Sequence, residues 1–116
     1  MEFEIFTKPL SVNQYYATSG RRIYVTAKGK QYKLGIINGL KESNITKLEG
    51  DLKLDIQLKL TKRYKMDVDN CLKPLLDSFE GFLYNNDSQI IDLRISKIFG
   101  YAEEIIVVRA EEVPRP

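Results

Sequence analysis

The chain of 116 residues contains no histidine, no tryptophan and one cysteine, Cys71. These counts exclude a zinc site of the usual kind, because such sites are built from several cysteine and histidine ligands. Any bound metal must instead be a hard, oxygen-preferring ion such as Mg²⁺ or Mn²⁺. A single cysteine also cannot form an internal disulfide, so we expect a cytoplasmic protein.

Long apolar segments are also absent. No run is long enough to span a membrane, and residues 1–5 are too acidic and too poor in apolar side chains for a signal peptide. No internal repeat and no Pro/Gly/Ser-rich linker divides the sequence, and 116 residues suit one domain. We therefore expect a single domain over residues 1–116 that has no membrane contact.

Charge is unevenly distributed along the chain. Residues 1–66 carry 13 Lys/Arg and 6 Asp/Glu, a balance of +7, whereas residues 67–116 carry 5 Lys/Arg and 10 Asp/Glu, a balance of −5. A basic first half favours a polyanionic partner. From charge alone, two differently charged solvated surfaces would be the simpler explanation.

The clearest predicted element is a strand over residues 51–60, in which every second residue is apolar. That period of two is typical of a strand with one buried face. Shorter strands are expected at residues 3–5 and 23–26. Residues 27–41 favour a helix, with these side chains directed inward: Tyr32, Ile36, Ile37 and Leu40.

A second helix is predicted over residues 70–83, with an apolar stripe made of Leu72, Leu75, Leu76, Phe79 and Leu83. Proline fits best in a first helical turn, so Pro74 predicts a helix that begins near Asp69 or Asn70. Strands follow at residues 90–98 and 105–110, and residues 111–116 are expected to form a frayed tail. The predicted fold class is α+β: a mixed sheet of four to five strands with two helices packed on one face.

Two aspartates, Asp67 and Asp69, stand where the chain passes from the long strand into the second helix. In an extended segment, residues two apart point to the same side, so both carboxylates would be directed into one space. Asp69 or Asn70 can equally serve as a helix N-cap. Without a further signal, a cap and a solvated turn explain the pair slightly better than a metal site.

Lys73 changes this balance, because a helix places it on the same face as Asp69 and Asn70. Asp77 follows four residues later on that face. This polar stripe can be an ordinary ladder of surface ion pairs, each worth roughly a few tenths of a kcal/mol. It can also hold a cation beside a carboxylate metal site, ready for phosphate.

The motif Asp67-x-Asp69-Asn70-x-x-Lys73-x-x-x-Asp77, followed by Gly81 and Asn86-Asp87-Ser88-Gln89-Ile90, resembles the signature of the RusA family of Holliday junction resolvases. The family pattern is D-x-D-N-x-x-K, a helix, and D-D-x-Q-[IV]. Nearer the N-terminus, Pro9-Leu10-Ser11-Val12-Asn13-x-x-Tyr16 and Tyr24-Val25-Thr26-x-x-Gly29-x-x-Tyr32 are similar to further family segments. The similarity covers nearly the whole chain.

This resemblance implies a homodimer that binds four-way DNA junctions, of the bacterial chromosome or of a phage, in recombination and repair. Such enzymes cut two opposed strands symmetrically with Mg²⁺, for which Mn²⁺ can substitute. The resemblance assigns metal binding to Asp67, Asp69 and Asp87 and catalysis to these residues and Lys73. In one departure, Asn86 replaces the first acid of the family's D-D pair, although the second acid is the catalytic one. The modest net charge of +2 is another departure and favours weaker non-specific DNA binding.

Phosphodiester hydrolysis suits these residue types. Two carboxylates about 4 Å apart repel by roughly 4 kcal/mol at an effective dielectric near 20, so a cluster of three persists if a cation occupies it. One or two divalent ions would polarise a phosphoryl oxygen and lower the pKa of bound water. Lys73 would stabilise charge that develops on the phosphate or the leaving oxygen. Because histidine is absent, the attacking water must be activated by metal, carboxylate or lysine.

DNA contacts are expected from two basic segments. The first comprises Arg21, Arg22, Lys28, Lys30 and Lys33. The second comprises Lys62, Arg63 and Lys65 and leads directly into Asp67, which makes it the stronger prediction. Asn13 and Tyr16 are also expected at the DNA, although Tyr15 and Tyr16 can equally belong to the core. Asn70, Asp77 and Lys97 are expected to support the site, but the orientation of Lys97 stays open.

Two other functions compete with junction resolution. A metal-dependent nuclease of the same architecture could prefer forks, flaps or other branched DNA. A catalytically silent DNA-binding module is the third possibility, against which the intact acidic set and Lys73 argue. No residue pattern identifies a dimer interface; the apolar helix at 72–83 or an edge strand could supply it.

Overall fold

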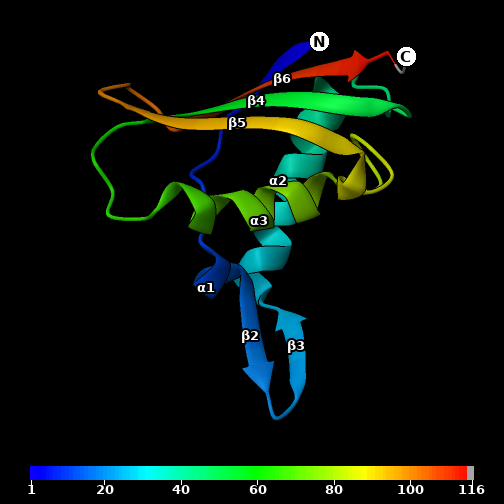
Figure 1. Cartoon of the computed structure of the whole chain (residues 1–116). Helices are drawn as coiled ribbons and strands as arrows, with labels where there is room; N and C mark the ends of the chain where they lie inside the picture. Colours follow the sequence, from blue (N-terminus) through cyan, green and yellow to red (C-terminus); the bar gives the residue numbers. More distant parts are fainter. Residues whose placement is uncertain (115–116) are drawn as a thin grey trace.

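The computed structural model describes residues 1–114 as a four-stranded sheet covered on one face by two helices, with a separate hairpin that projects away from the sheet (Figure 1). This architecture confirms the predicted α+β class. The main sheet contains β1 (Glu2–Ile5), β4 (Asp51–Leu60), β5 (Ile90–Phe99) and β6 (Ile105–Val113) in the order β1-β6-β4-β5. The sheet is mixed, because β4 and β5 are parallel and the other neighbours are antiparallel.

The helices are α1 (Val12–Tyr15), α2 (Ala27–Glu42) and α3 (Val68–Phe79), with a short 3₁₀ turn, η1 (Asp87–Gln89), before β5. The predicted strand at 23–26 exists as β3 (Arg22–Val25) but does not join the main sheet. It pairs with β2 (Tyr16–Ser19), across a turn in which Gly20 has a φ of +61°. Within residues 1–114, no helix is long and apolar enough to cross a membrane.

The core lies between the sheet and helices α2 and α3. One face of β4 contributes its five alternating apolar side chains, each at most 1% exposed: Leu52, Leu54, Ile56, Leu58 and Leu60. Burial of such a side chain stabilises the fold by about 1.5–3 kcal/mol. The four inward residues predicted for α2 are all buried. In the α3 segment, Leu75, Phe79 and Leu83 are buried, whereas Leu72 and Leu76 pack at the margin of the core.

The start of α3 differs from the prediction. The helix begins at Val68 with Asp67 as its N-cap, so Pro74 lies in its middle rather than in its first turn. Proline costs the helix one backbone hydrogen bond, but Pro74 is buried, and the packing of Leu75 and Phe79 fixes the helix on the sheet. The helix also ends four residues before the predicted Leu83, because α3 stops at Phe79 and Gly81 has a φ of +85°.

The prediction of a frayed tail from Glu111 was wrong for three residues. Strand β6 continues to Val113, and residues 111–113 pair with Lys53, Leu52 and Asp51 of β4. These backbone hydrogen bonds hold the segment in the sheet although its side chains are largely exposed. Pro114 follows the strand, and residues 115–116 lie outside the described part of the chain.

Candidate active site

Asp67 and Asp69 lie together at the start of α3. Asp67 is the N-cap residue, but its side chain makes no capping hydrogen bond, and Asp69 lies in the first helical turn. Both residues are exposed. Their carboxylate oxygens are therefore available to a ligand, and the positive end of the helix dipole favours negative charge there.

Lys97 supports the chain just before these acids. Its ammonium group donates a hydrogen bond of 2.6 Å to the carbonyl of Met66, the residue that precedes Asp67. The side chain thus reaches from β5 to the start of α3, which answers the question that the sequence left open. Lys97 is a positioning residue in this arrangement.

The basic loop at 61–66 is anchored through Glu104. The Glu104 carboxylate accepts hydrogen bonds from the backbone and hydroxyl of Thr61, at 3.0 and 2.9 Å, and from the Tyr64 hydroxyl at 2.5 Å. Burial opposes ionisation of Glu104, but these bonds and the charge of Lys8 outweigh it and lower its pKa. The Lys8 ammonium lies 4.3 Å from the centre of the Tyr64 ring. These contacts fix the basic loop that leads into Asp67.

Lys73 pairs with Asp77 on the exposed side of α3. Its Nζ lies 3.4 Å from Asp77 Oδ2, and the two side chains are 63% and 23% exposed. Burial, followed by the charges of Glu80 and Asp87, raises the pKa of Asp77. Asp77 thus lies near two further acids, and its negative charge is only partly balanced by Lys73.

Asp87 is positioned by the η1 turn. The Asn86 side chain accepts a hydrogen bond of 2.9 Å from the backbone of Ser88, and the backbone of Asp87 donates one of 3.2 Å to Glu80. The Gln89 side chain accepts from the backbones of Asn85 and Asn86, at 2.8 and 3.0 Å.

The same Gln89 amide also donates to the carbonyls of Leu48 and Gly50, at 3.1 and 3.0 Å. Gln89 therefore fixes the Asp87 turn to the chain just before β4. The replacement of an acid by Asn86 keeps a capping side chain at that position.

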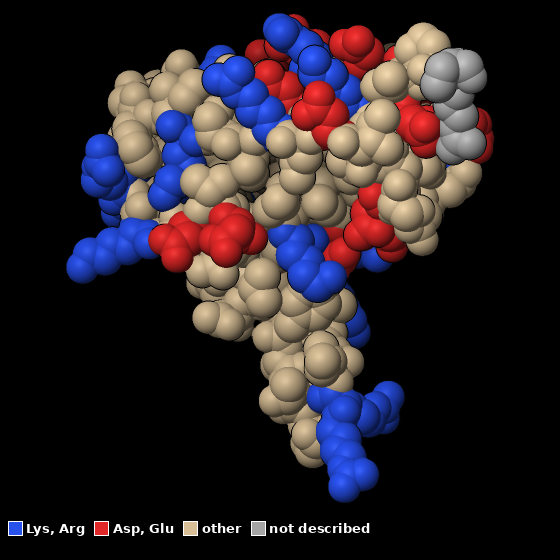
Figure 2. Space-filling view, in the orientation of Figure 1, with Lys and Arg blue, Asp and Glu red and all other residues tan. Residues whose placement is uncertain are grey.

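The structure divides the predicted metal ligands into two groups rather than one cluster. Asp67 and Asp69 lie at the start of α3, whereas Asp87 lies with Asp77 and Glu80 towards its end. The helical rise separates Asp69 from Asp77 by about 12 Å along the axis. Within residues 1–114, no three acidic or cysteine side chains are close enough to hold one metal ion. Figure 2 shows acidic groups on either side of basic atoms below the sheet.

These residues nevertheless fit Mg²⁺. In proteins this ion keeps several waters and is often held by one or two carboxylates together with substrate phosphate. The exposed pair Asp67 and Asp69 meets that need without a third acid. The second group concentrates uncompensated negative charge, as the raised pKa of Asp77 indicates.

Cys71 is structural. It is 1% exposed, and its thiol donates a hydrogen bond of 3.4 Å to the carbonyl of Asp67. Burial raises its pKa to about 11; the charge of Lys97 opposes this shift, and the charges of Asp69 and Asp67 add to it. A buried, protonated thiol is unreactive.

The predicted DNA-binding and supporting residues are spread over several parts of the surface. Lys65 and Asn70 line a cavity of about 390 Å³ beside Asp67 and Asp69, together with Lys8, Ser11, Gln14, Tyr64 and Met66. In the same loop, Arg63 packs 4.7 Å from the centre of the Phe99 ring and Lys62 5.4 Å from that of Tyr64.

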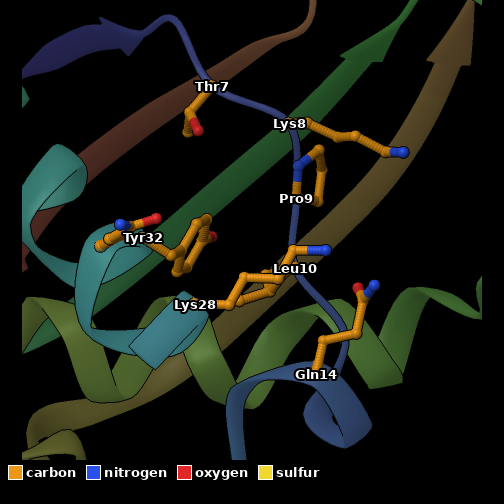
Figure 3. Close-up of a pocket in the computed structure, with 8 residues that line it drawn as sticks. Thr7, Lys8, Pro9, Leu10, Gln14, Lys28 and Tyr32 are labelled. Carbon is orange, nitrogen blue, oxygen red and sulfur yellow. The ribbon is translucent and has the colours of Figure 1, made fainter. Parts of the chain in front are cut away.

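A second cavity, of about 300 Å³, holds Lys28 with Lys8, Gln14 and Tyr32 (Figure 3). A third, of about 310 Å³, brings Asn13, Tyr16 and Lys73 together. Arg21 and Arg22 are exposed at the hairpin turn, and Lys30 is exposed on α2. Tyr15 is 1% exposed and belongs to the core, so of these two neighbouring tyrosines it is Tyr16 that lines a cavity.

Sequence reasoning missed several residues that shape the site. Gln89 lies in the recognised motif, yet its role in fixing Asp87 emerged only from its contacts. No sequence pattern identified Glu80 and Glu104, because each accepts hydrogen bonds from residues that only the fold brings near. Lys8 was likewise overlooked as an isolated lysine, although it borders two cavities.

Comparison with known proteins identifies the family of the chain. The family described as endodeoxyribonuclease RusA matches residues 7–109. A crossover junction endodeoxyribonuclease of Enterobacteria phage HK97 is 32% identical over 99 residues, which cover 75% of this chain and 74% of the relative. Those of Escherichia coli and Enterobacteria phage 82 are each 29% identical over 93 residues, covering 78% of this chain and 77% of the relative. The chain belongs to the RusA family of endodeoxyribonucleases.

Proposed function

We propose that this protein is a Holliday junction resolvase: an endonuclease that makes paired, symmetric nicks in four-way DNA junctions. The observation that carries this proposal is the line of Asp69, Lys73 and Asp77 on the exposed side of α3. Asp67 and the basic loop stand at the start of that line. A phosphate backbone can therefore meet positive charge and carboxylates at the same place. The relatives bear the name of this activity.

The proposed cofactor is Mg²⁺, with Mn²⁺ as a substitute. Asp67 and Asp69 would hold the ion. Asp87 is the proposed third carboxylate of the site, and from the second acidic group it would act on the attacking water or on a second ion. When bound, the ion polarises a phosphoryl oxygen and lowers the pKa of a bound water. The carboxylates orient that water and accept its proton, since the chain has no histidine.

Binding of the ion can be measured without DNA cleavage. Mn²⁺ titrated into the free protein, followed by electron paramagnetic resonance, should show weaker binding to Asp69→Asn than to wild type. Glu103→Gln removes an exposed acid outside the site and is the matched control. Equal Mn²⁺ binding by Asp69→Asn and wild type would remove Asp69 from the ligand set.

Lys73 is the proposed electrophilic residue. Its side chain is 63% exposed and lies between the two acidic groups. A cation in that place stabilises negative charge on the transferring phosphate or the leaving oxygen. Lys62, Arg63 and Lys65 would contact neighbouring phosphates, which predicts salt-dependent and largely sequence-independent binding.

A homodimer would supply the two active sites that paired nicks require. Of the two surfaces considered, the apolar face of α3 is already used, because Leu75 and Phe79 lie in the core. The edges of the sheet are β1 and β5; β5 is the longer, with ten residues against four, and its Ile91 and Leu93 are 58% and 37% exposed. Exposed apolar side chains on an unpaired edge favour addition of another strand.

Charge on β5 favours one register for that pairing. An antiparallel pair of β5 strands centred on Leu93 sets Asp92 opposite Arg94 of the partner subunit. Centring on Asp92 or on Arg94 would instead place like charges opposite each other, which is destabilising. The edge therefore matches a second copy of this chain.

The function is tested by cleavage of labelled DNA. Four-way junction, fork and linear duplex are incubated with wild type or Asp69→Asn in Mg²⁺, Mn²⁺ or EDTA. Junction nicks that disappear in EDTA and in the variant support the proposal. Cutting of forks alone would indicate a different branched substrate, and binding without any cutting would contradict an enzymatic role.

A further inference from the structure

The β2–β3 hairpin, which we call the finger (residues 16–25), extends beyond the helices on the side away from the main sheet (Figure 1). An isolated two-stranded hairpin is only marginally stable in water. The base of the finger is nevertheless held firmly. The Thr26 hydroxyl donates a hydrogen bond of 2.6 Å to the carbonyl of Gln14, and its backbone N–H donates one of 2.9 Å to that of Tyr15.

Close packing also fixes the finger against α2. A Cβ atom at Gly29 would lie 2.7 Å from the Tyr15 carbonyl oxygen and 2.8 Å from a methyl group of Val25. Only glycine permits this approach. The finger is therefore a projecting element with a rigid base.

One face of the finger leads to the proposed catalytic lysine. The strand register pairs Tyr16 with Val25 and Thr18 with Ile23, so Tyr16, Thr18 and Ile23 share a face. Together with Lys73 they line the groove of about 310 Å³ described above. The Lys73 ammonium lies 5.8 Å from the centre of the Tyr16 ring. A strand bound at Lys73 can thus place adjoining bases along this groove.

The outer end of the groove is unusually apolar for a projecting surface. Ile23 is 73% exposed, more than any other large apolar side chain within residues 1–114. Tyr24, on the opposite face, is 49% exposed. Exposed apolar side chains that adjoin polar groups mark interaction sites.

The surrounding charge identifies the kind of partner. Residues 6–41 contain seven Lys/Arg and no Asp/Glu. Basic side chains gather at the end of the finger in Figure 2, where Arg21 and Arg22 lie exposed next to Ile23. A partner that offers both phosphates and flat apolar surfaces fits this combination, and DNA bases beside their backbone are such a partner.

We propose that Ile23 is a wedge that enters the base stack at the branch point, and that the Tyr16 face of the finger receives the base displaced from the cut strand. This inference rests on the proposed function. Apolar side chains inserted between base steps unstack them, and this costs least where pairing is already interrupted. The wedge would therefore favour branched over linear DNA, while Arg21 and Arg22 contact phosphates on either side.

The experiment uses a four-way junction with 2-aminopurine in the cut strand next to the branch point, whose fluorescence rises when the base beside it unstacks. Wild type is compared with Ile23→Ala and with Leu34→Ala, which removes a 59% exposed aliphatic side chain from α2 outside the groove. Wild type and Leu34→Ala should raise the fluorescence, and Ile23→Ala should not. Ile23→Ala should bind the junction about tenfold more weakly and linear duplex within about twofold of wild type. In Mg²⁺ it should cut the junction about tenfold more slowly, and an unpaired base at the branch should restore the rate.

Equal fluorescence and equal junction affinity for Ile23→Ala and Leu34→Ala would overturn the inference. Conversion of Ile23→Ala to a monomer in sedimentation velocity, with equal losses for junction and duplex, would also overturn it, because Ile23 would then contact protein. The fluorescence measurement needs no cleavage. If wild type unstacks the base through Ile23 but cuts no branched DNA, the inference about Ile23 stands. The proposed resolvase activity is then contradicted.

Discussion

The ammonium group of Lys73 lies 3.4 Å from the carboxylate of Asp77, one turn further along α3. This pairing directs the lysine along the helix face, between the Asp67–Asp69 pair and the group that contains Asp87. An exposed pair of this kind contributes little to stability, about 0–1 kcal/mol. Under the proposed function, the pair holds a cation where a phosphate would pass.

Replacement of Lys73 by alanine should therefore affect the reaction far more than folding or binding. We expect kcat to fall about a hundredfold, because loss of one electrostatic stabiliser of the transition state has effects of that size. KM for the junction should change little. Single-turnover cleavage measures the effect on the reaction, and thermal unfolding measures the effect on the fold. Lys53→Ala, on the face of β4 away from the helices, is the control. A fall in binding as large as the fall in rate would make Lys73 a DNA contact only.

Asp77 should make stability depend on pH. Its pKa is raised above the ordinary value of 3.8 by burial, Glu80 and Asp87, so the folded chain binds this proton more tightly than the unfolded chain. The stabilisation is present below 3.8 and is lost as pH rises through the raised pKa. Asp77→Asn should flatten this decline in urea midpoints measured at several pH values. Parallel profiles for the variant, wild type and Glu103→Gln would contradict the assignment.

Gln89 should act as a positioning residue for Asp87. Gln89→Leu removes the four hydrogen bonds that fix the η1 turn, each worth about 0.5–1.5 kcal/mol. We expect faster hydrogen exchange at residues 85–90 and a higher Mg²⁺ concentration for half-maximal cleavage. Gln89→Glu keeps the hydrogen-bond acceptor but loses the donor. Its hydrogen exchange and its Mg²⁺ requirement should lie between those of wild type and Gln89→Leu. Unchanged Mg²⁺ dependence in Gln89→Leu would show that the turn does not serve the metal.

Leu93→Asp should separate the proposed dimer. The variant places like charges opposite each other in the centre of the β5 pairing, which is destabilising. Sedimentation velocity should show wild type as a dimer and the variant as a monomer, with cleavage reduced and the fold retained by circular dichroism. Leu34→Asp, on an exposed part of α2, should leave the dimer intact. A dimer that survives Leu93→Asp would exclude this edge.

The parts of the fold that depend on periodicity could be predicted from sequence. The alternation in β4 and the stripes of α2 and α3 directly specify which faces are buried. The start of α3 could not be predicted. The preference of proline for a first helical turn is a local rule, whereas tertiary packing of Leu75 and Phe79 on the sheet fixes this helix around Pro74. Strand β2 was missed for a similar reason: residues 16–19 have no apolar period and pair only through the Gly20 turn.

The candidate site also combines features that follow from local sequence with features that depend on tertiary contacts. Asp67, Asp69 and Lys73 lie close in sequence, so local geometry predicted that they lie together, although Asp69 is helical and not extended as expected. The surroundings of Asp87 depend on a contact with Glu80 and on Gln89, which bridges to residues near 50. No local sequence pattern predicts the contact of Asp87 with Glu80 or the bridge made by Gln89. For the same reason, the sequence did not predict that the acids form two groups.

The central claim is that two carboxylate sites cut opposed strands of one junction. A supercoiled plasmid with an extruded cruciform tests it most directly, because paired nicks within one complex give linear plasmid and independent nicks give open circles. We predict linear product with wild type in Mg²⁺, and none with Asp69→Asn or in EDTA. Open circles alone, or linear product from Asp69→Asn at the wild-type rate, would contradict the account.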